Sequence, residues 1–440
     1  MAGCPSADFG DLGRALSEYC SICKNGKEIQ LRFTRPGWWL LVTVVGTVPV
    51  VTMRLAMLAG RLDPAIIHHH SVVVALVAGT GIVCGAFLVA WAADVAQLDI
   101  AQSLAVALLA LVAVLPEYSV DMYFAYRAGS HPGGDYGHYA VANMTGANRL
   151  LIGLGWPFVV AIGWLHARAK HIVLEKERRL ELAFLLLATL YSFTIPFKAR
   201  LGPEDLVIFI GLFVWYITFT ARLERIEPEL VGPAAMLGAL PRRIRRRIVW
   251  LMFLWAAGVI LASAEPFSES LVEAGKQLGI PPFFLVQWLA PLASESPEFT
   301  IAAIYAARGS SGIALGTLLS SKINQWTLLV GLIPLVFSAG LRKVGSLAMD
   351  HVQTHELFLT SAQSLFALMV LADMRFSLRD AGVLAVLFLA QMITQMILPQ
   401  NESLRTLFGV VYIIFALGLL LAHRERREAL KETMEPLRRK

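Results

Sequence analysis

Apolar runs of about twenty residues, separated by short polar segments, constrain the fold of this chain more than any other feature of its sequence. A helix of that length crosses the hydrocarbon core of a bilayer. Twelve runs are present, at residues 38–60, 72–91, 103–126, 139–165, 180–197, 206–220, 248–264, 283–307, 313–338, 357–371, 381–398 and 404–422. The sequence therefore predicts an all-α polytopic membrane protein with about 12 transmembrane helices.

The composition agrees with a lipid environment. Only 16% of the residues are charged and 57% are hydrophobic, whereas soluble domains carry roughly 25% charged residues. So few charges cannot cover a soluble surface, which excludes a secreted, a disordered or a nucleic-acid-binding chain. The lipid bilayer is the expected partner, and the basic run at residues 242–247 is interpreted as a membrane anchor, with no nucleic acid involved.

The distribution of Lys and Arg predicts the orientation. If both termini are cytoplasmic, 27 of the 38 basic residues lie inside, 7 lie outside and 4 lie in or at the edge of spans. Cytoplasmic loops carry such an excess in membrane proteins. We therefore expect a cell (inner or plasma) membrane protein with both termini in the cytoplasm.

The polar gaps divide the chain into segments. The largest interior gap, at the middle of the chain, is interpreted as a cytoplasmic basic hinge between two halves. The predicted organisation is a cytoplasmic arm (1–37), an extra helix (38–60), a first half (71–222), the hinge (223–247), a second half (248–398), another extra helix (404–422) and a basic cytoplasmic tail (423–440).

The two halves contain an internal repeat. Residues 115–120 align with residues 296–301 at an offset of 181, and residues 146–148 align with residues 320–322 at an offset of 174. In the predicted topology the third span runs from inside to outside and the eighth runs from outside to inside. Inverted repeats of this kind place the ligand site near the bilayer midplane, where the two copies face each other.

Ionisable residues fall inside the repeated spans. Each costs about 2.5–3.5 kcal/mol near the bilayer centre on insertion scales, so these side chains must face one another, a cation or water. They are Glu117, Asp121, Arg149, Glu295, Glu298 and Lys322. Four acids and two bases leave a charge of −2, which one divalent ion balances. Carboxylate oxygens are the ligands that Ca²⁺ prefers.

A proline precedes one Glu in each copy. Pro116 and Pro297 cannot donate a hydrogen bond to the carbonyls of Val112 and Ala293, so we expect the helices to kink or open there. Freed carbonyls persist in a membrane where they line a cavity or bind an ion. Prolines that merely kink a helix are the alternative reading.

The motifs resemble those of the cation/calcium exchanger superfamily, the family of sodium/calcium exchangers. Its inverted alpha-repeats carry Gly-Thr-Ser-Leu-Pro-Glu on one helix and Gly-Asn-x-x-Gly-Ser-Asn on the next. The counterparts here are residues 112–117 and 142–148 in the first copy, and residues 293–298 and 316–322 in the second. The resemblance covers mainly residues 94–160 and 260–335, and it implies two inverted five-helix repeats with an extra helix at each end.

The resemblance also implies a ligand set for the transported ion. Glu117 and Glu298 would be the central metal-binding carboxylates, helped by backbone carbonyls near Ala113 and Ser294. The cation-binding set predicted by the resemblance and the helical spacing together is Glu117, Glu298, Asp121, Glu295, Ser294, Ser321, Asn148 and Ala113, with Asn143 a weaker candidate. The chain departs from the family pattern at Ala113, Val114, Ala147, Leu151 and Gln325, and at the bases Arg149 and Lys322.

These observations predict a membrane cation antiporter that exchanges Ca²⁺ or a similar cation for Na⁺ or H⁺ by alternating access. Lys322 and Arg149 are predicted to tune the charge of the site, and one of them would stand where relatives bind a coupling Na⁺. The alternative is that they snorkel or pair structurally with Asp121 and Glu295. A second functional hypothesis is a non-transporting sensor or scaffold in which Lys322 and Arg149 neutralise the site. No HExxH-like motif points to an enzyme, and no cofactor is expected besides the transported cation.

Three cysteines lie in the predicted N-terminal arm, at Cys4, Cys20 and Cys23. A CxxC pair with a third Cys and no evident fourth ligand is weak evidence for zinc, and reduced thiols are the favoured reading.

Overall fold

A computed structural model of the chain describes residues 36–99, 114–168, 170–222, 230–398 and 401–434. Ala113, Val112 and the cysteines Cys4, Cys20 and Cys23 lie outside these described residues, so the predictions that fall on them stay predictions.

Helices form nearly all of the described elements, as the apolar runs predict. The extra helix α2 (Pro36–Leu58) and the short α3 (Ile66–His69) precede the first half. The first half contains α4 (Ser71–Ala96), α6 (Leu115–Ser130), α7 (Tyr136–Leu150), η1 (Leu151–Gly155), α8 (Trp156–Ala167), β1 (His171–Val173), η2 (Lys176–Arg178), α9 (Arg179–Ser192), α10 (Thr194–Lys198), β2 (Arg200–Leu201) and α11 (Pro203–Thr220). The second contains α12 (Pro233–Gly238), α13 (Arg242–Leu278), α14 (Pro282–Ser294), α15 (Ser296–Ala307), α16 (Ser311–Asn324), η3 (Gln325–Leu329), α17 (Val330–Leu341), β3 (Leu347–Ala348), α18 (His351–Leu371), β4 (Arg375–Ser377), α19 (Leu378–Ile397), α20 (Glu402–Ala422) and α21 (Arg424–Thr433).

Nine helical segments within the described residues are long and apolar enough to cross a membrane. Three of the twelve predicted runs are not among them. The third continues as α6 but begins outside the described residues, the eighth is divided into α14 and α15, and the tenth forms α18, which carries Gln353, Glu356 and Gln363. The all-α membrane fold is therefore confirmed, whereas the count of twelve spans is not.

The two halves share an irregular backbone feature as well as their motifs. The third long helix of each half, α7–η1–α8 and α16–η3–α17, contains a five-residue π-helical turn. The turns begin at Leu151 and Gln325, which are separated by the offset of 174 residues that relates the second motifs. Both helices end beside an arginine with a left-handed backbone, Arg168 at φ 53° and Arg342 at φ 57°. Single π turns occur preferentially at functional positions.

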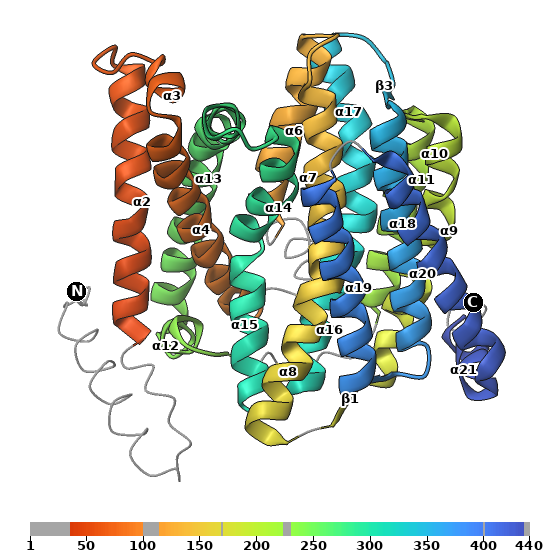
Figure 1. Cartoon of the computed structure of the whole chain (residues 1–440). Helices are drawn as coiled ribbons and strands as arrows, with labels where there is room; N and C mark the ends of the chain where they lie inside the picture. Colours follow the sequence, from red (N-terminus) through yellow and green to blue (C-terminus); the bar gives the residue numbers. More distant parts are fainter. Residues whose placement is uncertain (1–35, 100–113, 169, 223–229, 399–400, 435–440) are drawn as a thin grey trace, which may run out of the picture.

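Two short antiparallel sheets join the halves. β1 pairs with β4 at the lower end of the molecule as drawn in Figure 1, and β2 pairs with β3 at the upper end. Each sheet contains one strand from each half. The two halves are therefore tied to each other at both ends of the bundle.

The first long helices of the two halves, α4 and α13, pack along each other and form a group with α2, on the left in Figure 1. The three helices meet at Gly81. A Cβ atom there would lie 2.5 Å from Cγ1 of Val50 and 2.7 Å from Oγ of Ser263. Only glycine therefore permits this approach, which is how small residues bring membrane helices together.

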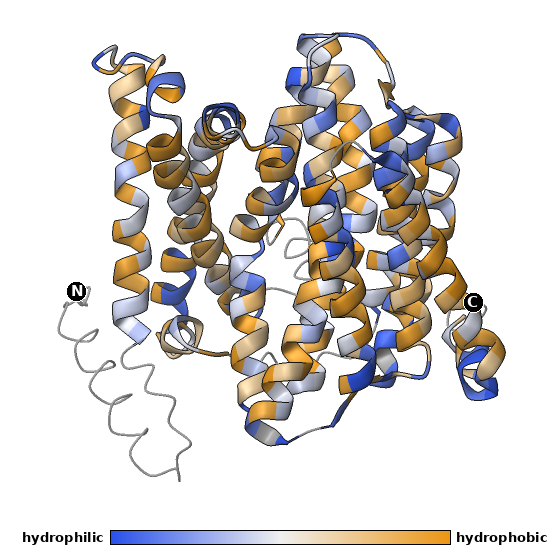
Figure 2. Ribbon diagram, in the orientation of Figure 1, coloured by the Kyte–Doolittle hydropathy of each residue, from blue (hydrophilic) through white to orange (hydrophobic). Residues whose placement is uncertain are grey.

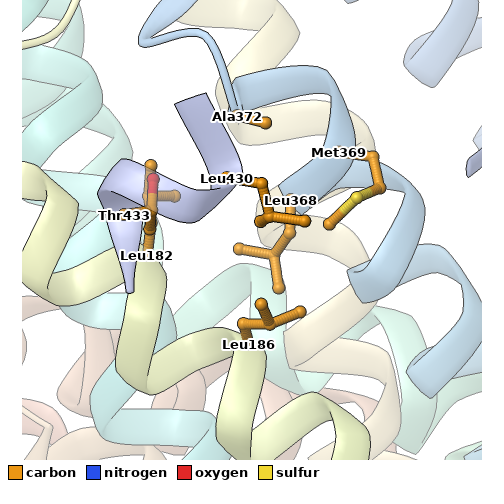
Figure 3. A pocket seen from close by; sticks show the side chains of 7 residues that line it. All are labelled: Leu182, Leu186, Leu368, Met369, Ala372, Leu430 and Thr433. Carbon is orange, nitrogen blue, oxygen red and sulfur yellow. The ribbon is translucent and has the colours of Figure 1, made fainter. Parts of the chain in front are cut away.

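Polar residues gather at the ends of the molecule. Figure 2 shows hydrophobic helices between hydrophilic upper and lower ends, and a largely hydrophilic α21. Arg426 of α21 pairs with Asp373 at 3.4 Å and with Asp380 at 3.7 Å, and Glu432 pairs with Arg179 of α9 at 2.6 Å. Leu430 and Thr433 of α21 close a small pocket, shown in Figure 3, that is otherwise lined by Leu182, Leu186, Leu368, Met369 and Ala372.

Candidate cation site

The repeated acidic motifs lie where new helices begin. Pro116 occupies the first turn of α6 and Pro297 the first turn of α15, where a helix tolerates a residue without an N–H donor. Glu117 and Glu298 therefore lie in the first turns of these helices, whose N-termini favour negative charge. In the second half the expected opening is a break at Glu295, which separates α14 from α15. Figure 1 shows the start of α6 and this break near mid-height in the bundle.

Gln325, the first residue of the π turn η3, connects the two acidic motifs. Its Nε2 donates a hydrogen bond of 2.7 Å to Oε1 of Glu117 and another to Oε1 of Glu295. The amide thus joins a carboxylate of the first half to one of the second. The sequence showed Gln325 only as a departure from a family motif, and nothing in the hydropathy pattern indicates the π turn that carries it.

Several carboxylates lie close enough to interact. Glu117 and Asp121 lie one turn apart on α6, and Gln325 holds Glu117 beside Glu295. In the described part of the chain, the second oxygens, Oε2, of Glu117, Glu295 and Glu298 are buried and accept no hydrogen bond. Buried carboxylate oxygens without donors are costly unless a cation or a proton neutralises them. Glu117 and Glu295 are 4% and 0% exposed, so bulk water does not solvate either.

Asp121 and Asn143 form a second polar pair beside this group. Nδ2 of Asn143 donates a hydrogen bond of 2.9 Å to Oδ1 of Asp121, and both residues are buried. Oδ2 of Asp121 and Oδ1 of Asn143 have no hydrogen-bond partner among the described residues. Asn143, the weaker candidate from the motif comparison, is thus directly coupled to a predicted site carboxylate.

Lys322 faces the other half of the molecule. Its Nζ donates a hydrogen bond of 2.6 Å to Oδ1 of Asn148 and lies 4.5 Å from the ring centroid of Trp326. The Lys322–Asn148 hydrogen bond therefore joins the second motif of one repeat, residues 316–322, to that of the other, residues 142–148. Lys322 forms no ion pair with a carboxylate of the described residues, so the alternative pairing with Asp121 or Glu295 is not found.

Arg149 follows Asn148 in sequence but contacts a different group of side chains. Its Nη2 lies 2.5 Å from Oε2 of Glu356, and its guanidinium lies 4.9 Å from the ring centroid of Trp288. Oε1 of Glu356 accepts a hydrogen bond of 2.6 Å from Nε of Arg405. Arg149 therefore shares the Glu356 carboxylate with Arg405, and its predicted role in tuning the charge of the cation site stays a prediction. Glu356 was missed since it immediately precedes the tenth apolar run.

A further carboxylate, Asp94 of α4, belongs near the site. α4 packs against α15, the helix that carries Glu298, and the buried Oδ2 of Asp94 has no hydrogen-bond partner in the described residues. The sequence missed Asp94 because the second apolar run was taken to end at Trp91. The balance of four acids and two bases therefore leaves out two buried acids, Asp94 and Glu356, and one buried base, Arg405.

The remaining candidates are small polar groups. The Ser294 hydroxyl donates to the carbonyls of Ala290 at 3.3 Å and Pro291 at 3.2 Å, inside its own helix. Ser321 is buried next to Lys322. Among the residues that the structure describes, no three His, Cys, Asp or Glu side chains are grouped so as to hold a metal ion. Backbone and amide oxygens are therefore needed to complete the predicted ligand set of a transported cation.

Comparisons with known proteins place this chain in one family of membrane transporters. A family model described as sodium/calcium exchanger protein matches residues 70–222 and 248–397. The crystal structure of the H⁺/Ca²⁺ exchanger CAX shares 40% sequence identity, covers 92% of this chain and 98% of its own, and has a TM-score of 0.84. A structure of the Ca²⁺/H⁺ antiporter protein YfkE, at 14% identity, covers 82% of this chain and 99% of its own with a TM-score of 0.60, which shows a shared fold. The search of curated proteins found no match.

Proposed function

The chain belongs to the sodium/calcium exchanger family, within the cation/calcium exchanger superfamily, and we propose that it is an antiporter that exchanges Ca²⁺ for H⁺ across the membrane. The family assignment confirms the resemblance of the motifs, and members of this family are membrane transporters rather than enzymes. The exchanged ions, the residues that bind them and the orientation in the membrane are the content of the proposal.

The observation that carries the proposal is the link that Gln325 makes between Glu117 and Glu295, which joins the acidic motifs of the two halves where helices begin. The Oε2 atoms of Glu117, Glu295 and Glu298 are buried, and no hydrogen-bond donor among the described residues reaches them. A divalent cation supplies the missing positive charge, and protons supply it when the cation leaves. The same carboxylates therefore bind the two ions in alternation, which is what an antiporter requires.

Lys322 favours H⁺ over Na⁺ as the coupling ion. Its ammonium group lies on Asn148, the amide that the family resemblance assigns to ion binding. A fixed positive charge at this position repels a second metal cation, whereas protons bind to the carboxylates themselves. The H⁺/Ca²⁺ exchange named for the 40% identical CAX supports this choice.

The alternative function, a sensor or scaffold with a neutralised site, has less support. It requires Arg149 and Lys322 to neutralise the site carboxylates. Arg149 is instead paired with Glu356, and Lys322 bonds to an uncharged amide. The acidic groups are therefore left available to a cation.

The proposal places the protein in the cell (inner or plasma) membrane with both termini in the cytoplasm. Figure 1 shows α21 and the start of α2 on the same side of the bundle, which supports termini on one side. The excess of basic residues assigned to that side supports the cytoplasmic orientation.

Flux through purified protein in proteoliposomes tests the function. We expect ⁴⁵Ca²⁺ uptake to follow an imposed pH gradient and to be indifferent to a Na⁺ gradient. Uptake driven by a Na⁺ gradient alone would show that Na⁺, and not H⁺, is the coupling ion. Folded protein without Ca²⁺ flux under either gradient would refute the antiporter function.

Substitution of the central carboxylates tests the site. Glu117→Gln and Glu298→Gln keep the shape of the side chain but remove the charge that the cation needs, so we expect each to lower uptake at least a hundredfold. Glu428→Gln, on the exposed surface of α21, is the matched control and should transport normally. Undiminished flux in Glu298→Gln would remove the site assignment while leaving the function intact.

A further inference from the structure

Two buried glutamates outside the cation site occupy equivalent positions in the two halves. Glu181 lies in the first turn of α9 and Glu356 in the second turn of α18, and they are 175 residues apart in the sequence. The same spacing relates the capping residues Asp205 and Asp380 at the starts of α11 and α19. Glu181 and Glu356 are thus repeat-related, and the proposed exchange reaction uses neither of them directly.

Glu356 binds the third long helix of the first half. Its carboxylate contacts Arg149 of α7, the residue that follows Asn148, at 2.5 Å. It also accepts a hydrogen bond of 3.0 Å from Nε2 of Gln287 in α14. Gln287 in turn lies directly against α7, because a Cβ on Gly146 would be 1.8 Å from the Gln287 carbonyl oxygen. Glu356 therefore fixes α7 against α14, the helix that leads into the break at Glu295.

Glu181 makes the converse contact with the third long helix of the second half. Its Oε1 accepts a hydrogen bond of 2.8 Å from the hydroxyl of Ser320 in α16, two residues before Lys322. Arg178 donates to the same carboxylate oxygen at 2.7 Å and to the Ser320 hydroxyl at 3.2 Å. Tyr216 of α11 donates to it at 3.4 Å.

The geometry points to a reciprocal pair of positioning residues: Glu181 and Glu356 each bind the third long helix of the opposite half beside its second motif, and they hold Lys322 and Asn148 in register with each other. This inference rests on the proposed exchange function. A charged carboxylate suits the role because hydrogen bonds to an ionised group are short and strong, and a buried pair tolerates little displacement.

The mechanism follows from where each contact lies. Lys322 and Asn148 come from different halves and meet at 2.6 Å, so a small shift of either helix breaks their hydrogen bond. Gln325, which joins Glu117 to Glu295, follows Lys322 by one turn of the same helix. Release of Ser320 from Glu181 therefore loosens both Lys322 and Gln325, and weakens cation binding without removing a ligand.

The test compares affinity with stability for three variants of the full-length protein in proteoliposomes. Ser320→Ala removes one hydrogen bond to Glu181 without leaving a new buried charge, and we expect the apparent KM for Ca²⁺ to rise about fivefold. Glu181→Gln should raise it about tenfold. Glu356→Asp keeps the charge but shortens the side chain, and it should raise the KM by a similar factor.

The control is Asp205→Asn. Asp205 is a buried carboxylate that caps α11 and pairs with Lys198 at 2.5 Å, remote in sequence from both motifs. It should lower the thermal midpoint in detergent and leave the KM for Ca²⁺ unchanged. If the three test variants change only the thermal midpoint, as the control does, the positioning role is refuted.

Failure of this inference is distinguishable from failure of the proposed function. Wild-type protein without Ca²⁺ flux refutes the antiporter. Wild-type flux with an unchanged KM in Ser320→Ala and Glu181→Gln refutes only the positioning role. Because Ser320→Ala removes a single hydroxyl from a partly exposed side chain, it supplies a folded variant even if the substitutions of the glutamates prevent folding.

Discussion

Arg149 and Lys322 are both fully buried bases on the third long helices of the two halves, yet the fold treats them differently. Arg149 has a carboxylate, Glu356, and an aromatic ring as partners. Lys322 has an aromatic ring and the neutral amide of Asn148, and no carboxylate among the described residues. Arg149 is therefore paired within the scaffold, on a carboxylate that it shares with Arg405, whereas Lys322 has no carboxylate partner among the described residues.

This difference shows that the role of a buried charged side chain is inferred from the group it pairs with, and not from its position in the sequence. A compensated charge fixes helices to each other, and breaking its pair exposes an unpaired ion to a medium of low dielectric constant. An uncompensated charge at a cation site alters which ions bind. Substitutions can separate these two roles. Loss of a helix-fixing pair should lower the free energy of unfolding, whereas loss of an ion-selecting charge should change transport.

The largest effect is expected from Glu356→Gln. The substitution leaves Arg149 buried beside a neutral side chain and also removes the carboxylate that accepts from Arg405. Losing one partner of a buried pair costs about 3–5 kcal/mol. Reversible unfolding in mixed micelles measures the free energy. A loss below about 1 kcal/mol would show that Arg149 is not compensated by this carboxylate.

A smaller effect is expected from Asn148→Ala. It removes the acceptor of the Lys322 ammonium, and a hydrogen bond to a charged group contributes about 1.5–3 kcal/mol. The double variant Asn148→Ala with Lys322→Met removes the charge as well, and we expect it to regain most of that loss in the same unfolding assay. The single variant Lys322→Met should stay within about 1 kcal/mol of wild type in stability but alter the response of Ca²⁺ uptake to pH and Na⁺ gradients. An unaltered response of Ca²⁺ uptake in Lys322→Met would show that the charge of Lys322 does not determine the coupling ion.

The smallest effect is expected from an ion pair at the end of α4. Hydrogen bonding from Arg245, at 2.8 Å, lowers the pKa of Asp99 from its ordinary value. The pKa of Asp99 is lower in the folded state than in the unfolded state, where it is about 3.9. The ion pair therefore stabilises the fold fully above about pH 3.9, and this stabilisation is lost as the pH falls through the folded-state pKa. Asp99→Asn should cost less than about 1 kcal/mol at neutral pH. Thermal unfolding of both proteins should converge on acidification, and a difference that persists at low pH would contradict the assignment.

Much of the architecture could be predicted from the sequence because its signals are local. Runs of apolar residues gave the helices, and the proline before Glu117 and before Glu298 indicated where helices are interrupted. The family resemblance at these motifs is confirmed by the match over both halves. The site residues themselves stay predictions, although Gln325 joins Glu117 of the first half to Glu295 of the second.

Other features depended on contacts between distant segments. Glu356 and Arg405 border apolar runs and look like interfacial charges in the sequence, but the fold buries them as an ion pair, and Glu356 also pairs with Arg149. Asp94 lies just past a predicted span, and its helix α4 packs against α15, the helix that carries Glu298. Gln325 matters because a π turn begins at that residue, and hydropathy does not encode such a turn.

By itself, the sequence determined that this protein lies in a membrane and that its two halves carry related acidic motifs, since length, hydropathy and spacing are properties of the chain. Only the tertiary structure decided which buried charges are paired. Pairing depends on atoms that approach within about 3 Å across helices from different halves. That is why two bases that look alike in the sequence have different predicted roles in the folded protein.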